Sequence, residues 1–363
     1  MIPIAKPMIG EEEKKNVQEV LDSGMLAQGK WVAEFEKEFS KYLGVKNSIA
    51  VSNGTAALDL VLKAIGVGVG DEVIVPDFTF IATANSVLFQ GAKPVFVDVD
   101  DRIFNINIED VKNKITPRTK AVIAVHLFGQ PADIGPLAEV CKDKEVVLIE
   151  DACQAHGAEY KGKKVGSFGV GTFSFYPTKN MTTGEGGIVT TSDEEIGRKI
   201  RLMRDHGQSE KYSHAVLGYN MRLTNIGASI GLAQLKKLDE FNKKRIENAE
   251  YLSSEIEKIE GLTVPYVSKD VKHVFHQYVV KVEKGFPLNR DELKDYLHSK
   301  GVGTAVHYPI PIHFQPLYKN LGYDEGICPV TSDLCGKVLS IPVHPALEKK
   351  DLEYIVKTLK EVK

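Results

Sequence analysis

The chain has 363 residues, of which 43% are hydrophobic and 26% are charged, and its formal net charge is only −3. This charge gives no electrostatic reason to expect binding to nucleic acid or to an anionic membrane. The four cysteines form no C-x-x-C pair, which argues against a disulfide framework and against a zinc knuckle.

We therefore expect no metal site and a reducing, cytoplasmic environment. No uninterrupted apolar run approaches the length of a membrane span, and the first residues lack the apolar core of a signal peptide. The length is enough for one large domain and a smaller one.

Residues 48–189 alternate between strand-like and helix-like patterns, which predicts an α/β architecture. We expect strands at 49–52, 72–76, 94–98, 121–126 and 146–151, helices at 55–65, 81–89 and from 133 onward, and short final strands at 172–176 and 187–190. Nearly continuous apolar strands joined by helical crossovers indicate a buried, mostly parallel sheet.

The pattern changes after residue 192. We expect a charged helix at 193–205, one or two long helices over 223–258, strands at 276–282 and 304–308, and helices at 293–300 and 349–363. We place the domain boundary inside the long helix, which gives a large domain at 1–245 and a small domain at 246–363. We expect that the N-terminal helix, 11–21, can pack on the small domain.

In an open α/β sheet, ligands bind beyond the carboxyl ends of the strands. After the first strand, Gly54 and Thr55 stand at a helix N-terminus, where free backbone N–H groups suit a phosphate. Ordinary helix capping explains the same residues, and taken alone it is the better interpretation. After the second strand, Phe80 could stack on a flat ring or pack in the core, at nearly even odds, whereas Phe78 fits the core better.

Asp151 ends the fifth strand, with Gln154 and His156 just after it. A buried acid at a strand end needs a partner, which a protonated pyridine nitrogen or a salt bridge could supply. Ser174 and Lys179 follow on the next strand and its exit loop, just before the run from Gly184 to Gly187. A lysine and an aspartate at two strand ends are what a pyridoxal phosphate site requires, since the amine binds the aldehyde and the carboxylate keeps the ring nitrogen protonated.

Five motifs in order resemble the DegT/DnrJ nucleotide-sugar aminotransferases, which are pyridoxal phosphate enzymes of fold type I, the aspartate aminotransferase-like fold. The motifs are Asn53-Gly-Thr-Ala-Ala-Leu, Pro76-Asp-Phe-Thr-Phe, Glu150-Asp-Ala-Cys-Gln-Ala-His-Gly, Phe173-Ser-Phe-Tyr-Pro-Thr-Lys-Asn and Gly184-Glu-Gly-Gly. The resemblance covers nearly the whole chain. It implies a seven-stranded, mostly parallel sheet between helices in the large domain and a smaller C-terminal α+β domain.

The resemblance also implies a role for each matching residue. Lys179 corresponds to the lysine that carries pyridoxal 5'-phosphate and moves the proton, and Asp151 to the partner of the ring nitrogen. The other cofactor contacts that it implies are Gly54, Thr55, Ser174, Phe80 and Gln154. Asn220 corresponds to an asparagine that reaches the phosphate of the neighbouring subunit, which implies a homodimer with shared active sites.

On the substrate side, His307 and Tyr308 resemble a loop of the small domain that meets the sugar. Arg222 is a candidate for binding a carboxylate or a diphosphate, with a structural salt bridge as the equally plausible alternative. Cys153 stands where alanine is common in the family, and Gly227 where glutamine is common, which bears on packing more than on activity.

The implied reaction is transamination of a nucleotide-linked ketosugar with L-glutamate as the amino donor. The start of the long helix, 223–225, resembles enzymes that act at C-4, whereas the loop at 307–308 resembles those that act at C-3. Of the two, we expect a 4-keto-6-deoxy sugar as the acceptor, with a 3-keto sugar as the alternative. A sugar dehydratase is disfavoured because those relatives carry histidine at the position of Lys179. A non-catalytic regulator is disfavoured by the intact Asp151, Ser174 and Lys179, and a nicotinamide dehydrogenase by the absence of G-x-G-x-x-G.

Overall fold

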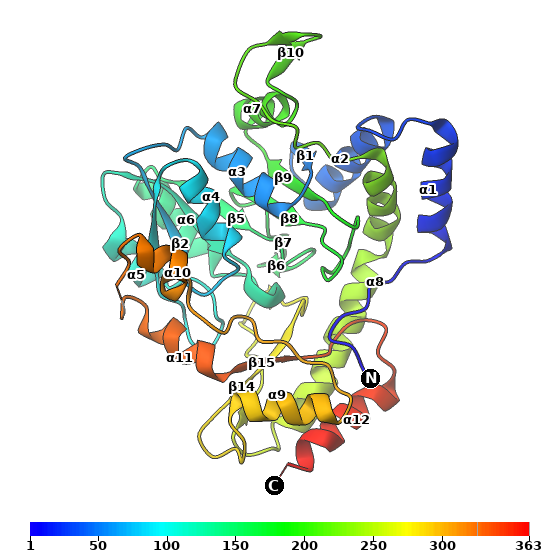
Figure 1. Cartoon of the computed structure of the whole chain (residues 1–363), viewed down its shortest axis with the longest axis vertical. Helices are drawn as coiled ribbons and strands as arrows, with labels where there is room; N and C mark the ends of the chain where they lie inside the picture. Colours follow the sequence, from blue (N-terminus) through cyan, green and yellow to red (C-terminus); the bar gives the residue numbers. More distant parts are fainter. Residues whose placement is uncertain (325, 363) are drawn as a thin grey trace.

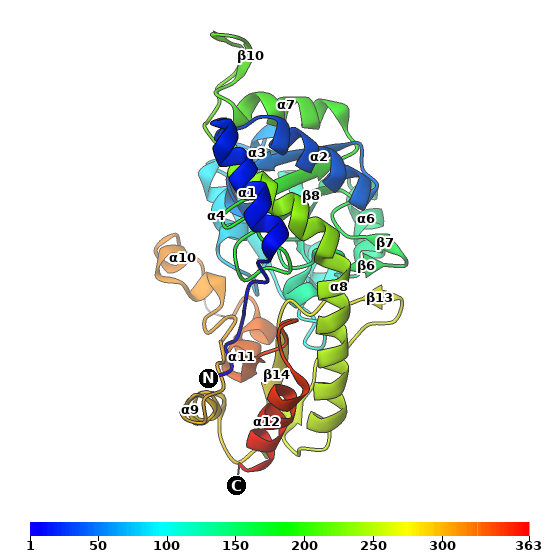
Figure 2. The ribbon, with the colours of Figure 1, turned by 90° about the vertical axis from the view of Figure 1, so that its right-hand side faces the viewer.

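The computed structural model describes residues 1–324 and 326–362 (Figure 1). A larger unit holds a seven-stranded sheet between helices, and a smaller unit lies below it in the view of Figure 1. One long helix runs through both units (Figure 2).

The central sheet has the strand order β1-β9-β8-β5-β4-β2-β3. Its strands are β1 (Asn47–Val51), β2 (Glu72–Pro76), β3 (Lys93–Val97), β4 (Thr119–Val125), β5 (Val147–Asp151), β8 (Val170–Ser174) and β9 (Gly187–Thr191). Only β9 runs against its neighbours, since β5, β4, β2 and β3 pair in parallel and β8 joins them in parallel to β5. The predicted α/β class and the mostly parallel seven-stranded sheet are confirmed.

Helices cover both faces of the sheet because alternate strand residues point to opposite sides. Val73 and Val75 pack toward α3 (Gly54–Ala64), α4 (Ala82–Phe89) and α7 (Glu194–Arg204), whereas Ile74 packs toward the other face. That other face is covered by α2 (Lys30–Leu43), α5 (Ile108–Lys114), α6 (Ile134–Asp143) and α8 (Asn225–Ile256). The sheet is therefore buried on both faces, and the loops at its edge are free to form a site.

The smaller unit is an antiparallel three-stranded sheet with helices against it. Its elements are β12 (Leu262–Thr263), β14 (Tyr278–Val282), β15 (Val338–Ile341), α9 (Arg290–Ser299), α11 (Pro329–Lys337) and α12 (Lys349–Lys360). The short helix α10 (Pro316–Asn320) packs on the larger unit instead, where the ring centroid of Tyr318 lies 5.2 Å from that of Phe96. Its hydrophobic core begins at Ala249 on the second half of α8 and includes Tyr278 and Leu293. The predicted boundary at residue 245 remains a prediction, and residue 363 of the predicted last domain and helix lies outside the described residues.

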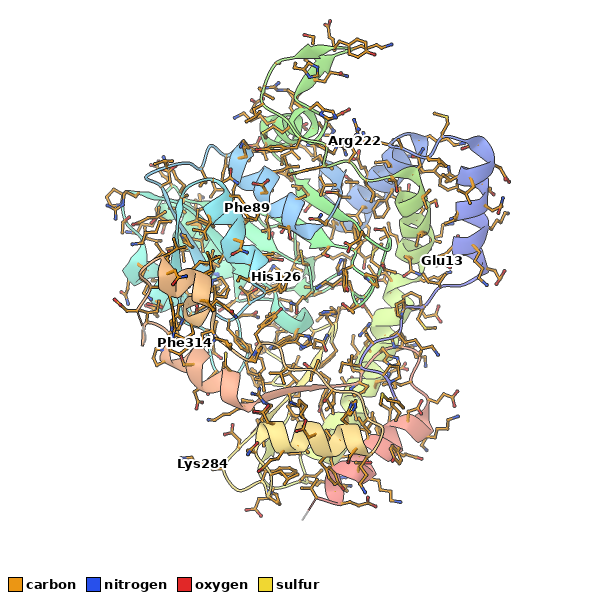
Figure 3. The ribbon with its side chains drawn as sticks, in the orientation of Figure 1. Glu13, Phe89, His126, Arg222, Lys284 and Phe314 are labelled. Carbon is orange, nitrogen blue, oxygen red and sulfur yellow. The ribbon has the colours of Figure 1, made fainter. Side chains whose placement is uncertain are left out.

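The N-terminal helix α1 (Glu11–Ser23) packs along the first half of α8, where Glu13 binds Lys237 at 2.8 Å (Figures 2 and 3). The segment ahead of α1 reaches the smaller unit instead: Ile2 pairs with Val302, and the carbonyl of Pro3 lies 3.1 Å from Nε2 of His344. This segment thus connects the two units on the side of α8.

Two hairpins, one short strand and two 3-10 turns complete the described chain. They are β6 (Glu159–Tyr160) with β7 (Lys163–Lys164), β10 (Gln208–Glu210) with β11 (Ser213–His214), β13 (Val271–Lys272), η1 (Leu127–Gly129) and η2 (Ile312–Phe314). The β10–β11 hairpin projects from the top of the molecule (Figures 1 and 2).

The strand predicted at 304–308 is wrong. Within this segment only Ala305 pairs with a strand residue, Ser340, after which the chain leaves the edge of the small sheet. The reason is that His307 turns its ring toward Ser340 while Tyr308 reaches across to the larger unit. The alternating pattern of this segment is typical of a strand, but the segment forms a loop between the two units.

Candidate active site

A cavity of about 900 Å³ opens at the carboxyl ends of β1, β5 and β8. It is lined by most of the residues that the sequence singled out, namely Gly54, Thr55, Phe80, Asp151, Gln154, Ser174, Lys179, His307 and Tyr308. The first seven come from the larger unit and the last two from the smaller unit, so the cavity lies between them. Its position agrees with the rule for open α/β sheets.

Lys179 lies on the loop that follows β8, half-buried in the wall of the cavity. Within the described part of the chain, its amine has no hydrogen bond or ion pair. Burial lowers the pKa of Lys179 from its ordinary value, while the nearby Cys153 and Asp151 act in the opposite direction. An amine in this state is available as a nucleophile and as a proton carrier.

Asp151 is the last residue of β5 and is only 6% exposed. Its Oδ2 accepts a hydrogen bond from the Thr83 hydroxyl at 2.9 Å, and its Oδ1 accepts the backbone N–H of Cys153 at 3.2 Å. These two bonds orient the carboxylate, which no side-chain cation pairs within the described residues. An oriented, unpaired carboxylate in a cavity suits a cationic ring nitrogen.

The N-terminus of α3 forms a cradle with Ser174, the last residue of β8. The Asn53 side chain caps this helix by accepting the N–H of Ala56 at 2.8 Å, so the N–H groups of Gly54 and Thr55 remain for a ligand. A Cβ built on Gly54 would lie 2.8 Å from the Cβ of Ser174 and 3.0 Å from the sulfur of Cys153. Glycine is therefore required by space, and the arrangement suits a phosphate at a helix N-terminus.

Aromatic rings line one side of the cavity. Phe80 is 56% exposed and its ring centroid lies 6.3 Å from that of Tyr308, whereas Phe78 is buried and its centroid lies 6.2 Å from that of Tyr308. A flat cofactor ring could therefore stack on Phe80. Phe78 has the core position that the sequence favoured.

Gln154 connects the two units at the floor of the cavity. Its Oε1 accepts the backbone N–H of Phe128 at 2.9 Å, and its Nε2 lies 3.2 Å from the hydroxyl of Tyr308. A second link lies deeper, where Oδ2 of Asp77 is 2.5 Å from Nδ1 of His313 and Oδ1 accepts the His313 backbone N–H. Together these contacts hold the loop at 307–314 against the larger unit.

Three histidines close to the site are held neutral by burial. Burial lowers the pKa of His156 to about 3 and that of His307 to about 4, with the charge of Lys179 adding to both effects. His276 lies in the cavity wall and its pKa is lowered for the same reason. The ring of His156 packs near Phe173 and Phe175 at the carboxyl end of β8, and His156 is not among the residues that line the cavity.

Two predicted site residues lie outside this cavity. Asn220 is exposed, and Arg222 forms an ion pair with Asp205, at the level of α7 where the projecting hairpin leaves the body (Figure 3). The pairing of Arg222 matches the salt-bridge alternative that the sequence left open. Both remain predictions as site residues.

The sequence did not identify Thr83, His276 or the segment at Ile4 as parts of the site. Thr83 and Asp151 are 68 positions apart in the chain, so no local sequence pattern predicts their hydrogen bond. His276 follows a loop and precedes β14, so its position beside Lys179 depends on how the two units meet. Thr83 shares α4 with two other polar residues, Asn85 and Ser86, so the helix sequence did not single it out.

These residues fit pyridoxal 5'-phosphate. The cradle of Gly54, Thr55 and Ser174 would hold the phosphate, the exposed ring of Phe80 would face the pyridine, and Asp151 and the amine of Lys179 would meet the ring nitrogen and the aldehyde. The observation behind this fit is that an unpaired carboxylate, an unpaired amine and free helix N–H groups share one cavity.

A sequence profile of the DegT/DnrJ/EryC1/StrS aminotransferase family matches residues 7–360. GDP-perosamine synthase of Caulobacter vibrioides is 40% identical, with 99% of this chain and 98% of the relative covered. UDP-N-acetyl-3-dehydro-alpha-D-glucosamine 3-aminotransferase of Acidithiobacillus ferrooxidans is also 40% identical, over 96% of this chain and 93% of the relative. Among solved structures, S. venezuelae DesV in complex with a ketimine intermediate is 37% identical with a TM-score of 0.93, covering 96% of this chain and 94% of that one.

Proposed function

Since this chain belongs to the DegT/DnrJ/EryC1/StrS aminotransferase family, we propose that it transfers the amino group of L-glutamate to a nucleotide-linked 4-keto-6-deoxy sugar. The broader statement rests on the family and its relatives: the protein is a pyridoxal phosphate-dependent nucleotide-sugar aminotransferase of fold type I. The donor, the sugar and the assembly are the parts that we propose.

The observation that carries the proposal is the unpaired amine of Lys179 in a cavity that also holds Asp151. When bound there, pyridoxal phosphate supplies an aldehyde that can carry an amino group and a ring that takes up electrons from the donor carbon. The carboxylate of Asp151 keeps the proton on the ring nitrogen, which makes the ring a better electron acceptor. Thr83 fixes the direction of that carboxylate.

We assign two roles to the amine of Lys179. Its Nζ would hold the aldehyde of the cofactor, and as a free amine the same Nζ would move a proton at the α-carbon of the bound donor. Burial favours the unprotonated form of the free amine, since it lowers the pKa of Lys179. On the acceptor side, the same Nζ would move the proton at the sugar carbon that gains the amine.

A homodimer with shared active sites is part of the proposal. Asn220 lies outside the cavity of its own chain, at the base of a projecting hairpin on which Tyr212 is 82% exposed (Figure 1). Val216 and Leu217, which follow the hairpin, are exposed as well, and several exposed apolar side chains on one protruding arm support an interface. Mixing Lys179→Ala subunits with Asn220→Asp subunits tests it, because only the mixed dimer then has one intact site. We expect about a quarter of wild-type activity from an equal mixture, and no recovery if each site is complete in one chain.

A 3-keto acceptor is the second candidate. The relative from Acidithiobacillus ferrooxidans is a 3-aminotransferase by name, and the loop at His307 and Tyr308, which resembles that of enzymes acting at C-3, lines the cavity. The 4-keto proposal rests on the resemblance of residues 223–225, where Thr224 caps α8. A cytoplasmic location belongs to the proposal too, and the four free cysteines support it.

The test follows the absorbance of the protein loaded with pyridoxal phosphate. L-Glutamate should bleach the yellow colour, and L-aspartate or L-alanine should not do so at the same concentration. Nucleotide sugars with a 4-keto or a 3-keto group are then added to the bleached enzyme. Recovery with the 3-keto sugars alone would reject the 4-keto proposal, and a protein that stays colourless with the cofactor would reject the activity.

In the described residues, no helix has the length and apolar character to cross a membrane.

A further inference from the structure

The hydrogen bonds of Gln154 have a fixed direction. Its Oε1 lies 2.9 Å from the backbone nitrogen of Phe128, and a backbone N–H can only donate. The oxygen of the amide must therefore face Phe128, so the NH₂ group faces the hydroxyl oxygen of Tyr308 at 3.2 Å. The two ends of this amide are not interchangeable.

The same reasoning decides which way the hydroxyl of Tyr308 points. An NH₂ group can only donate, so the Tyr308 oxygen accepts from Gln154 and its own proton is directed elsewhere. Across residues 1–324 and 326–362, no protein group accepts that proton, and Tyr308 lines the cavity. We propose that Tyr308 is a fixed hydrogen-bond donor into the active site, which holds an oxygen atom of the cofactor ring or of the sugar; the sugar source rests on the proposed function.

The surroundings keep this donor in one orientation. Phe128 has a φ of 59°, in the left-handed region that non-glycine residues seldom adopt, and Gly129 follows at 99°. A Cβ on Gly129 would lie 2.8 Å from the backbone nitrogen of His276, so this turn cannot relax outward. The Tyr308 ring meanwhile packs within 6.2 Å of Phe78 and 6.3 Å of Phe80.

The acceptor must be an oxygen with an available lone pair. Burial raises the pKa of Tyr308 well above its usual value, and the charge of Asp151 acts in the same direction, so the hydroxyl keeps its proton at any pH the enzyme meets. Two oxygens in such a cavity have the required character: the phenolic oxygen of the pyridine ring, and the carbonyl or hydroxyl oxygen of the sugar. Both would accept the same bond.

The experiment compares Tyr308→Phe with Tyr323→Phe, in protein loaded with pyridoxal phosphate. Tyr323 is a matched control, since its hydroxyl donates to the carbonyl of Pro94 away from the cavity. Three quantities are measured: the pH midpoint of the cofactor absorbance without substrate, the rate of bleaching by L-glutamate, and the rate of recovery with dTDP-4-keto-6-deoxyglucose. A lost charge-assisted hydrogen bond should change the affected quantity about 10- to 100-fold, or about one pH unit.

A shifted pH midpoint in Tyr308→Phe supports the proposal and makes the cofactor oxygen the acceptor. An unshifted midpoint with unchanged bleaching and a recovery at least tenfold slower supports it and makes the sugar oxygen the acceptor. No change in any quantity, an equal slowing of bleaching and recovery without a shifted midpoint, or the same changes in Tyr323→Phe would overturn it. If wild-type protein rejects this sugar, the proposed substrate fails, and the pH midpoint alone then decides on Tyr308.

A double-mutant cycle tests the direction of the bond itself. Gln154→Glu places a carboxylate opposite Tyr308, which would then donate to residue 154 instead of into the cavity. Adding Tyr308→Phe to Gln154→Glu should therefore change the affected quantity less than threefold, against the tenfold or greater effect in the wild-type background. Equal effects in both backgrounds would show that the direction of the Gln154 amide does not set the donor, and would overturn the argument.

Discussion

Substitution of Glu150 tests which interactions fix the end of β5, the strand that carries Asp151. Its carboxylate is fully buried and accepts three backbone N–H groups, from Gly166 and Phe168 at 2.7 Å and from Gly169 at 2.8 Å. Nε2 of His126 lies 3.1 Å from the same carboxylate. The side chain thus ties the end of β5 to the turn that leads into β8.

Glu150→Gln keeps the shape and removes the charge. The amide oxygen can serve Phe168 and Gly169, but the NH₂ group then faces both the N–H of Gly166 and the Nε2–H of His126, whose Nδ1 already accepts from the backbone of Ala132. Two buried donors left without an acceptor, at ~1–3 kcal/mol each, bring the expected loss to about 4 kcal/mol. With an unfolding entropy of about 2.1 cal/mol/K per residue, this loss lowers the melting temperature by ~5 °C.

The assay is thermal and urea unfolding of the cofactor-free protein at one fixed concentration. Glu109→Gln is the control, because Glu109 has a side chain that is 76% exposed and pairs with Lys112 at 2.7 Å on the surface. Such a pair contributes less than about 1 kcal/mol. Equal losses in the two variants would refute the reasoning on Glu150.

The pH dependence of the free energy of unfolding is a second test of Glu150→Gln. Burial alone would raise the pKa of Glu150, but the hydrogen bonds and His126 outweigh it, so the folded pKa lies below the ordinary value of 4.5. A lowered carboxyl pKa stabilises the fold fully above pH 4.5 and loses this effect as the pH falls through the folded pKa. The difference between wild type and Glu150→Gln should therefore be constant from pH 8 to pH 6 and shrink below 4.5.

Three other outcomes are expected. Lys179→Met should abolish turnover and the borohydride-reduced cofactor adduct. In the cofactor-free wild type, the buried lysine releases its proton at a lower pH than the same lysine in the unfolded chain, so the free energy of unfolding should rise as the pH approaches 10.5. Lys179→Met should remove this rise. Gly54→Ala should weaken cofactor binding at least tenfold by forcing a Cβ against Ser174 and Cys153, which equilibrium dialysis measures. Arg222→Ala should raise the Michaelis constant for glutamate or the sugar without loss of bound cofactor, and unchanged constants for both would leave Arg222 with only its ion pair to Asp205.

The sequence was most informative where chemistry follows a strand. Asp151, Ser174 and the start of α3 could be placed together because parallel strands bring their carboxyl ends to one edge. The α2 helix was missed, although Val32, Phe35, Phe39 and Leu43 repeat at helical spacing and are all buried.

Contacts between the two units were beyond sequence reasoning. His307 and Tyr308 were predicted as substrate-side residues only from the family resemblance, and the segment that contains them was predicted to be a strand. The bond from Gln154 to Tyr308 spans 154 positions, and the Asp77 pair with His313 spans 236. Such pairings depend on how two separately folded cores dock, which no local periodicity encodes.

The continuity of α8 limits how the enzyme can open for its substrates. At about 1.5 Å per residue, its 32 residues give an uninterrupted rod of ~48 Å whose first half is fixed to α1 and α2 and whose second half is built into the smaller core. A hydrogen-bonded helix without a proline resists bending, so the two units can separate only by a small twist about the axis of α8 or by loosening their contacts with one half of it. A pair of probes along α8 would then report one constant separation through the catalytic cycle, while a pair across Gln154 and Tyr308 would register each opening.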